Sequence, residues 1–446
     1  MATLLVSAPA DPARLLITGA RVLDPREGID AVLDVAVSGG VITAVGEAGS
    51  VDAPDGAETI DAAGRLLVPA FVDPHVHFRT PGQEHKETIA TGTASAAAGG
   101  YCAVLAMPNT DPVLDSAPLL RSLFDEAGRS ARVPLGFVPA ITRGLEGDEL
   151  TEMAELRESG AAGFTDDGRP VVSAGMLRKA LQYQRMCGGT LALHEEDPSL
   201  SAGGSMHEGA VSAVLGVAGI PSISESTMVA RDAQIAGYEQ GRIHIQHLSA
   251  RASVEAIADA KARGIGITGE ASPHHLCLTD EAVRGLDTRR KMNPPLRTED
   301  DRQALIAGLK DGTIDCIATD HAPHARSEKE VPFEQAPMGS TGLETAFAAI
   351  YTGLVVPGTI DLGLLVRRMS DGAALFEMPV PKIATGAPAD LTLIDLDAEW
   401  VAGEHGYQSK SENCCFDGMA LTSQIAMTIA GGAVVHRTPV REGVGA

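Results

Sequence analysis

The chain has 446 residues, of which 44% are hydrophobic and 21% are charged, as in water-soluble globular proteins. This length exceeds what one hydrophobic core usually holds, so we expect one large domain and a smaller one. The formal net charge of −24 argues against nucleic acid or an anionic membrane as a partner, and no apolar run approaches the length of a bilayer span. The start of the chain lacks the pattern of a signal peptide, and six cysteines without a CxxC pair indicate a reducing cytoplasm.

Short strands broken by turns occupy both ends of the chain. They include "RLLITGARVLD" and "AVLDVAVSGGVITAVG" near the start, and "ADLTLIDLD" and "SQIAMTIAGGAVVHR" near the end. We therefore predict that residues 1–67 and 380–446 form one small, discontinuous β domain. It would flank an α/β domain made of residues 68–379.

Between these ends, short apolar strands alternate with Ala-rich helical stretches, which is typical of βα units around a parallel sheet. Polar residues gather at the C-terminal ends of almost all eight strands. A barrel places its active site at that rim, whereas an open doubly wound sheet concentrates its site at one switch point. We therefore predict a (β/α)8 TIM-type barrel whose strands end in "DPHVHF", "AMPN", "VPAIT", "FTDD", "LHEED", "QHLS", "ASPHH" and "ATDHAPH".

Histidines and one aspartate stand at inward-facing positions of these strand ends. Side chains alternate between the two faces of a strand, so every second residue points to the same face. His247 would then share a face with Ile243 and Ile245, and Asp320 with Ala318. Nitrogen and carboxylate ligands without thiolate suit Zn²⁺, with Mn²⁺ and Co²⁺ as alternatives. The expected ligands at the rim are His75, His77, His194, His247 and Asp320.

Two metal ions held close together need an anionic bridge between them. The fourth strand offers no lysine near its end but ends in Asp166 and Asp167. Asp167 is two residues after Thr165 and should face inward with Gly163 and Thr165, so it is favoured, and Asp166 is the alternative. Two metals would lower the pKa of a water between them, and Asp320 is placed to take its proton and deliver it to a leaving nitrogen. Hydrolysis of an amide, or the reverse, is the expected reaction class.

Several stretches together resemble the dihydroorotases of the amidohydrolase superfamily, in their long bacterial form: "HVHFRTPGQEHKET", "MPNT", "FTDDG", "LHEED", "QHLS", "KMNPPLR", "ATDHAPH" and "GLET". The resemblance covers essentially the whole chain. "ATDHAPH" and "DPHVHFR" are shared with dihydropyrimidinases and allantoinases, whereas "KMNPPLR" is more specific to dihydroorotases. The resemblance implies reversible, zinc-dependent cyclisation of N-carbamoyl-L-aspartate to L-dihydroorotate in pyrimidine (UMP) biosynthesis.

The resemblance also implies roles for individual residues. One metal would be bound by His75, His77 and Asp320, a second by His194 and His247, and Asp167 would bridge them where other relatives use a carboxylated lysine. The substrate carboxylate would be held by Arg79, Asn109 and His324, and the ring amide would contact Asn293. Where the family often has an aromatic-glycine pair beside the ring, this chain has Met338 and Gly339.

Two other functions stay open at this point. A related cyclic amidase acting on hydantoin, dihydropyrimidine or allantoin would have a substrate without the ring carboxylate, so Arg79 would lack a partner. A non-catalytic scaffold bound to aspartate transcarbamoylase should have lost metal ligands. The family implies two Zn²⁺ ions per subunit, a homodimer and aspartate transcarbamoylase as a candidate partner. Glu195 and Glu196, next to a ligand, are expected to be rim charges.

Overall fold

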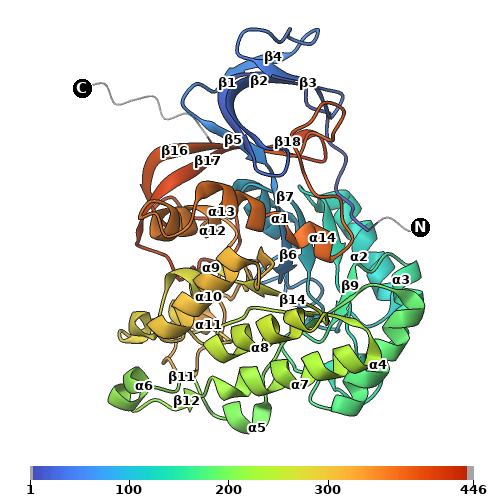
Figure 1. Cartoon of the computed structure of the whole chain (residues 1–446), viewed down its shortest axis with the longest axis vertical. Helices are drawn as coiled ribbons and strands as arrows, with labels where there is room; N and C mark the ends of the chain where they lie inside the picture. Colours follow the sequence, from blue (N-terminus) through green and yellow to red (C-terminus); the bar gives the residue numbers. More distant parts are fainter. Residues whose placement is uncertain (1–3, 439–446) are drawn as a thin grey trace.

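Eight parallel strands form the centre of the molecule, in a computed structural model that describes residues 4–438 (Figure 1). Two groups of strands pair side by side, three in one group and five in the other. In chain order the strands are β6 (Phe71–Val76), β7 (Tyr101–Ala106), β8 (Leu135–Phe137), β9 (Gly163–Thr165), β10 (Thr190–Leu193), β13 (Arg242–Ile245), β14 (Gly266–Ala271) and β15 (Cys316–Ile317).

Hydrogen bonds outside the regular ladders join the two groups into a ring. Between β8 and β9, the Ala162 N–H donates to the Phe137 carbonyl oxygen over 2.9 Å. Between β15 and β6, the His77 N–H donates to the His321 carbonyl oxygen over 2.9 Å, and Val76 forms a parallel bridge with His321. The predicted eight-stranded barrel is therefore confirmed.

Helices follow most of the strands and cover the outside of the barrel (Figure 1). In α2, the buried residues Ala117, Leu120, Leu123 and Ala127 recur at helical spacing, so one face of the helix packs inward. The helices are α1 (Ile89–Ala98), α2 (Ala117–Ser130), α3 (Met153–Glu158), α4 (Ala174–Cys187), α5 (Pro198–Ser201), α6 (Ala210–Leu215), α7 (Ile223–Glu239), α8 (Arg251–Ala262), α9 (Pro273–Cys277), α10 (Glu299–Asp311), α11 (Arg326–Lys329), α12 (Ala346–Ile350), α13 (Leu362–Arg368) and α14 (Gly372–Leu375). A short ladder of β11 (Met206–His207) and β12 (Gly219–Ile220) lies between β10 and α7.

Strands from both ends of the chain share one second sheet, at the top of Figure 1. Its order is β18-β17-β16-β5-β1-β2-β3, with β4 beside β1. Only Ala70 separates β5 from β6, so this sheet leads directly into the barrel. The strands are β1 (Leu15–Asp24), β2 (Ile29–Ser38), β3 (Val41–Glu47), β4 (Glu58–Asp61), β5 (Leu66–Pro69), β16 (Leu391–Val401), β17 (Ala420–Ala430) and β18 (Ala433–Arg437).

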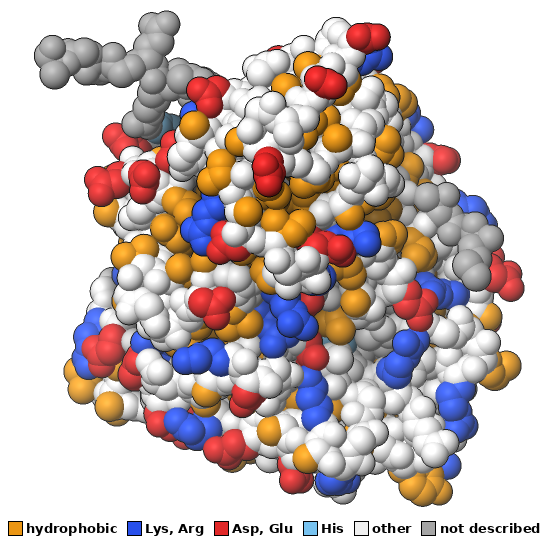
Figure 2. Space-filling model, turned by 45° about the horizontal axis from the view of Figure 1, so that its top comes forward, with side chains coloured by type: hydrophobic (Ala, Val, Ile, Leu, Met, Phe, Trp, Pro, Cys, Tyr) orange, Lys and Arg blue, Asp and Glu red, His pale blue; other side chains and the backbone are white. Residues whose placement is uncertain are grey.

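The discontinuous β part of the predicted fold is thereby confirmed. Its apolar core, which includes Ile17, Val35, Leu67 and Ile429, is separate from the core of the barrel. The expected limits, residues 1–67 with 380–446 and residues 68–379, stay a prediction, and residues 1–3 and 439–446 lie outside the described part. Within residues 4–438, no helix has the length and apolar composition that crossing a membrane requires. Figure 2 shows acidic and basic side chains interspersed over the described part of one face, rather than gathered by sign.

Candidate metal centre

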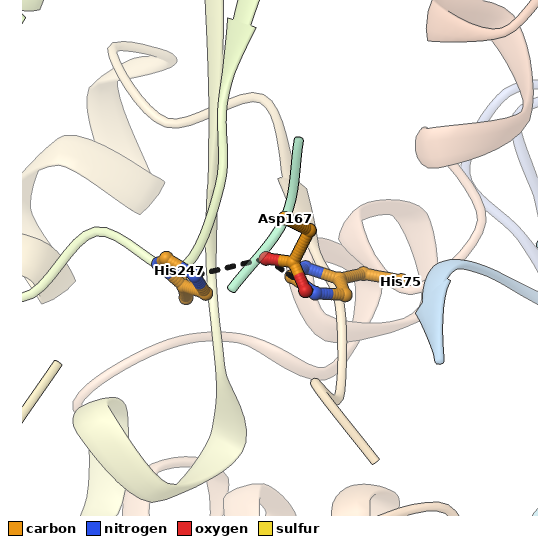
Figure 3. A group of neighbouring side chains, drawn as sticks. All are labelled: His75, Asp167 and His247. Carbon is orange, nitrogen blue, oxygen red and sulfur yellow. Dashed lines mark ion pairs between the residues drawn. The ribbon is translucent and has the colours of Figure 1, made fainter. Parts of the chain in front are cut away.

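The six expected metal ligands meet at the C-terminal rim of the barrel. Figure 3 shows the carboxylate of Asp167 lying between the imidazoles of His75 and His247. All six side chains are buried, with exposed fractions from 0% for His75 to 8% for Asp320. Three ligand atoms of His75, Asp167 and His247 lie within 4.8 Å of one another, and so do three of His75, His77 and Asp320. The rim thus holds two overlapping groups, each able to surround one ion.

The Asp167 carboxylate faces both groups. Its Oδ2 lies 3.3 Å from His77 Nε2, whereas its Oδ1 lies 3.5 Å from His247 Nε2 and 3.7 Å from His194 Nδ1. His75 Nε2 lies 3.5 Å from the same Oδ1. The carboxylate thus has one oxygen beside His77 and the other among three histidines, so it could contact two cations at once.

Asp166 points elsewhere. Its carboxylate accepts hydrogen bonds from the backbone N–H groups of Ile141 and Thr142, over 2.8 and 2.9 Å, and from the Thr142 hydroxyl. These bonds hold the loop that follows β8. Of the two neighbouring aspartates, the structure therefore brings Asp167 to the histidines.

Hydrogen bonds on the far side of the first two imidazoles determine which nitrogen faces the centre. His75 Nδ1 lies 2.5 Å from Glu270 Oε1, and His77 Nδ1 lies 2.8 Å from Asn109 Oδ1. Because both partners are acceptors, each Nδ1 can carry a proton and leave Nε2 for a metal ion; at His77 such an ion would replace the contact between Nε2 and Asp320 Oδ1, which spans 3.0 Å. Among the described residues, His75 Nε2 has no hydrogen-bond partner although it is fully buried. An unpartnered lone pair beside two carboxylates fits a metal ion, whose ligands are nitrogen and oxygen atoms about 2 Å away.

The charge around these imidazoles favours a cation. Burial disfavours protonated His75, yet Glu270 and Asp167 outweigh burial and raise its pKa well above the ordinary value. Burial also lowers the pKa of His194, but the carboxylates of Asp167 and Glu196 outweigh burial and raise this pKa to about 9. Burial would raise the pKa of Asp320, but His75 and His77 lower it to about 2. The same field that stabilises an extra proton here would stabilise a divalent cation.

The expected alternation along β13 is wrong. His244 Nε2 lies 3.0 Å from Glu270 Oε2, and Gln246 Nε2 lies 3.4 Å from His75 Nδ1, so these two residues face the barrel axis. Ile243 belongs to the apolar core instead. His247 reaches the centre because its backbone turns into the left-handed region, at φ 32°, which resets the side-chain direction after the strand.

Arg79 adds a cation beside the centre. Its side chain is buried, and its Nε donates to the Pro323 carbonyl oxygen over 3.2 Å. Within residues 4–438 this is the one hydrogen bond of the guanidinium, so both terminal nitrogens are free to donate. Burial lowers the pKa of Arg79 against the opposing charges of Asp320 and Asp167. A planar guanidinium held in this way is suited to a carboxylate.

The other expected substrate contacts lie around Arg79. The Asn109 Oδ1 is taken by His77, which leaves its amide N–H₂ as a donor. His324 Nε2 donates to the Met338 carbonyl oxygen over 2.8 Å, and its Nδ1 is buried without a hydrogen-bond partner among the described residues. Gly339 has φ 127°, and a Cβ there would stand 2.8 Å from the Cβ of Ala322. The backbone of 338–339 therefore approaches His324 more closely than a side chain would allow.

Asn293 reaches the centre through Glu196, whose role was not foreseen. Asn293 Nδ2 donates to Glu196 Oε2 over 2.6 Å, and the same oxygen lies 3.4 Å from His194 Nε2. Burial would raise the pKa of Glu196, but His194 lowers it to about 2. The expectation that Glu195 is a rim charge is wrong, because the residue is 2% exposed and burial and Asp232 raise the pKa of its carboxyl well above the ordinary value.

Glu270 is the supporting residue that sequence reasoning missed. From β14 it contacts His75 on β6 over 2.5 Å and accepts a hydrogen bond from the His247 backbone N–H over 3.1 Å. One carboxylate thus orients ligands of both groups. Its inward parity with Thr268, two residues earlier in "GITGEA", is a signal that could have found it.

Comparisons with known proteins identify relatives of this chain. A family model described as dihydro-orotase-like matches residues 64–253. The dihydroorotase of Anaeromyxobacter dehalogenans (strain 2CP-C) is 46% identical over 425 residues, which cover 95% of this chain and 98% of that protein. The dihydroorotase of Pelotomaculum thermopropionicum is 46% identical over 428 residues, which cover 96% of this chain and 99% of that protein.

Solved structures with the same fold carry a different name. The L-hydantoinase from Arthrobacter aurescens is 25% identical with a TM-score of 0.84, covering 95% of this chain and 96% of that one. The D-hydantoinase from Thermus sp. is 25% identical with a TM-score of 0.79 and the same coverage. At 46% identity over nearly its full length, the chain belongs to the dihydroorotase family.

Proposed function

We propose that this protein is a dihydroorotase that interconverts N-carbamoyl-L-aspartate and L-dihydroorotate with two zinc ions bound at the rim. One observation carries the choice of substrate: the free terminal nitrogens of Arg79 lie beside the metal ligands, within electrostatic reach of Asp320 and Asp167. Dihydroorotate has a ring carboxylate that this guanidinium can hold while the scissile amide faces the ligands. Hydantoin and dihydrouracil lack that carboxylate and would leave the buried cation unpaired, which is costly.

The ligand set proposed for the two ions takes His75, His77 and Asp320 from one group at the rim and Asp167 and His247 from the other, and adds His194, whose Nδ1 lies 3.7 Å from Asp167 Oδ1. His75, His77 and Asp320 would hold one ion, His194 and His247 the other, and Asp167 would bridge them. When bound, the ions polarise the amide carbonyl and make water acidic enough to react near neutral pH. Nitrogen and carboxylate donors favour Zn²⁺, with Mn²⁺ and Co²⁺ as alternatives.

Asp320 is the proposed acid–base residue. Since its pKa is about 2, the carboxylate is ionised at neutral pH and can accept a proton from the attacking water. It can then return that proton to the amide nitrogen as the ring opens. In the cyclisation direction, the same carboxylate would take the proton from the ureido nitrogen. Arg79 and Asn109 would orient the substrate through its carboxylate during both directions.

A coupled test decides between the candidate functions. Zinc-loaded protein is assayed with dihydroorotate, hydantoin and dihydrouracil, and its metal content is measured by atomic emission. We expect turnover of dihydroorotate alone, with two zinc ions per chain. Preference for hydantoin would favour a cyclic amidase, and metal-free, inactive protein would favour a scaffold. All six proposed ligands are present, which argues against the scaffold.

Partners and location are also proposed. A homodimer is expected from the family, with aspartate transcarbamoylase as a candidate partner, and light scattering with and without that enzyme tests both. All six cysteines are free thiols, although Cys414 and Cys415 are adjacent. Free thiols suit a reducing compartment, so we place the enzyme in the cytoplasm.

A further inference from the structure

A segment of the β-sheet part crosses to the rim of the barrel. Residues 402–419, here called the strap, connect β16 to β17. At its middle, the Ser411 hydroxyl donates to the Lys86 carbonyl oxygen over 2.7 Å, and the Lys410 N–H donates to Glu87 Oε1 over 3.1 Å. The strap is thereby bonded to the loop that follows β6, the loop that carries Arg79.

Asn413 of the strap bonds two further rim loops with one side chain. Its Oδ1 accepts from the His324 N–H over 3.0 Å. Its Nδ2 donates to the carbonyl oxygens of Ala322, over 3.0 Å, and Gly339, over 3.1 Å. The side chain is 4% exposed. Buried amides with all these bonds satisfied fix the relative position of the groups they join.

The bonded residues are those that border the substrate contacts. Ala322 and His324 flank Pro323, whose carbonyl oxygen accepts from Arg79 Nε over 3.2 Å. Gly339 follows Met338, whose carbonyl oxygen accepts from His324 Nε2 over 2.8 Å. Asn413 therefore fixes the acceptor that orients the guanidinium and both ends of the bond that orients the His324 imidazole.

We propose that Asn413 is a positioning residue for the substrate carboxylate, acting through Arg79 and His324. The inference rests on the proposed function, because Arg79 and His324 hold that carboxylate only if dihydroorotate is the substrate. Asn413 does not contact the metal ligands through any of its three hydrogen bonds. Its removal should thus loosen substrate binding while the metal centre and the chemical step are kept.

The test compares Asn413→Ala with Glu412→Ala, a matched control at the adjacent, exposed strap position. For Asn413→Ala we expect a KM for dihydroorotate raised roughly tenfold with kcat changed less than about threefold, because uniform substrate binding is what is lost. Metal content should equal that of the wild type. Hydrogen exchange should be faster in peptides covering 320–326 and 336–342. Glu412→Ala should match the wild type in every measurement.

If Asn413→Ala does not fold, Asn413→Asp replaces it, because aspartate keeps the acceptor for the His324 N–H and loses both donors. The same rise in KM is expected from this variant. Unchanged KM and unchanged exchange in a variant of an active wild type would overturn the inference alone. A fall in kcat together with loss of metal would overturn it too, since Asn413 would then support the metal centre. A wild type that leaves dihydroorotate untouched would overturn the proposed function first.

Discussion

Replacing Arg79 with methionine removes the guanidinium and keeps most of the side-chain volume. Two terminal nitrogens are free in the structure, so the substrate carboxylate can form two charge-assisted hydrogen bonds. At about 1.5–3 kcal/mol each, their loss lowers kcat/KM by roughly 10²- to 10⁴-fold. The metal ligands are untouched, so zinc content should stay at the wild-type level. Initial rates of dihydroorotate hydrolysis and atomic emission measure the two quantities.

A second substrate isolates the interaction between Arg79 and the substrate carboxylate. The carboxamide of dihydroorotate lacks the charge that Arg79 is proposed to hold, so the wild type should process it poorly. Arg79→Met should then reduce activity toward the carboxamide much less than activity toward dihydroorotate, because the interaction is already absent. Equal losses on both substrates would mean that Arg79 acts through structure. A variant with kcat/KM within about threefold of the wild type on dihydroorotate would remove Arg79 from the site.

Three further predictions concern charge. Asp320→Ala should lower kcat by roughly 10²-fold or more even in metal-containing protein, and near-wild-type rates would exclude it as the acid–base residue. Asp167→Asn should lose metal. Asp166→Asn should keep its metal and lower the free energy of unfolding by about 1–3 kcal/mol. The opposite results in atomic emission and urea titration would assign the bridging role to Asp166. Burial and Lys291 lower the pKa of Lys329 to about 7. Between about pH 7 and 10, Lys329 is therefore protonated in the unfolded chain and largely neutral in the folded protein. The free energy of unfolding then rises with pH by up to about 1.4 kcal/mol per pH unit. Lys329→Met should remove that slope between about pH 7 and 9, and an unchanged slope would contradict the assignment.

The barrel could be predicted because its signals are local. Each strand is a short apolar run that ends in polar residues, and the alternation with helices needs no knowledge of distant contacts. The placement of His75 and Asp167 followed from the same alternation, and the structure brings both to the rim. Sequence reasoning misplaced Glu195 because it is buried next to Asp232 and Arg231 of α7, which are distant in sequence, and burial and Asp232 raise the pKa of its carboxyl well above the ordinary value. The residues adjacent to Glu195 in the sequence do not indicate these neighbours.

Alternation stops predicting side-chain direction where the backbone leaves the extended region. Arg79, His247 and Asp320 have φ values of 57°, 32° and 49°, in the left-handed region that side chains other than glycine seldom adopt. Each such residue costs about 1–3 kcal/mol, and such costs are concentrated at functional sites. A strand period of two residues cannot predict where a side chain points after such a turn. Residue type could indicate that Arg79, His247 and Asp320 belong to the site, but it could not predict where their side chains point.

Two buried carboxylates hold the turns at the strained ligands in place. Glu270 accepts from the His247 N–H over 3.1 Å, and Asp73 accepts from the N–H and hydroxyl of Thr319, directly before Asp320, over 3.2 and 2.5 Å. Barrels of this kind are usually filled by branched apolar residues, and charged groups in that position would destabilise them without such bonds. Glu270 and Asp73 therefore act structurally, because each holds the backbone at a strand end where a proposed metal ligand, His247 or Asp320, leaves the strand. The buried carboxylates and the strained backbone at the rim therefore depend on each other. Removing Glu270 or Asp73 would release the backbone conformation that directs His247 or Asp320 toward the proposed metal site.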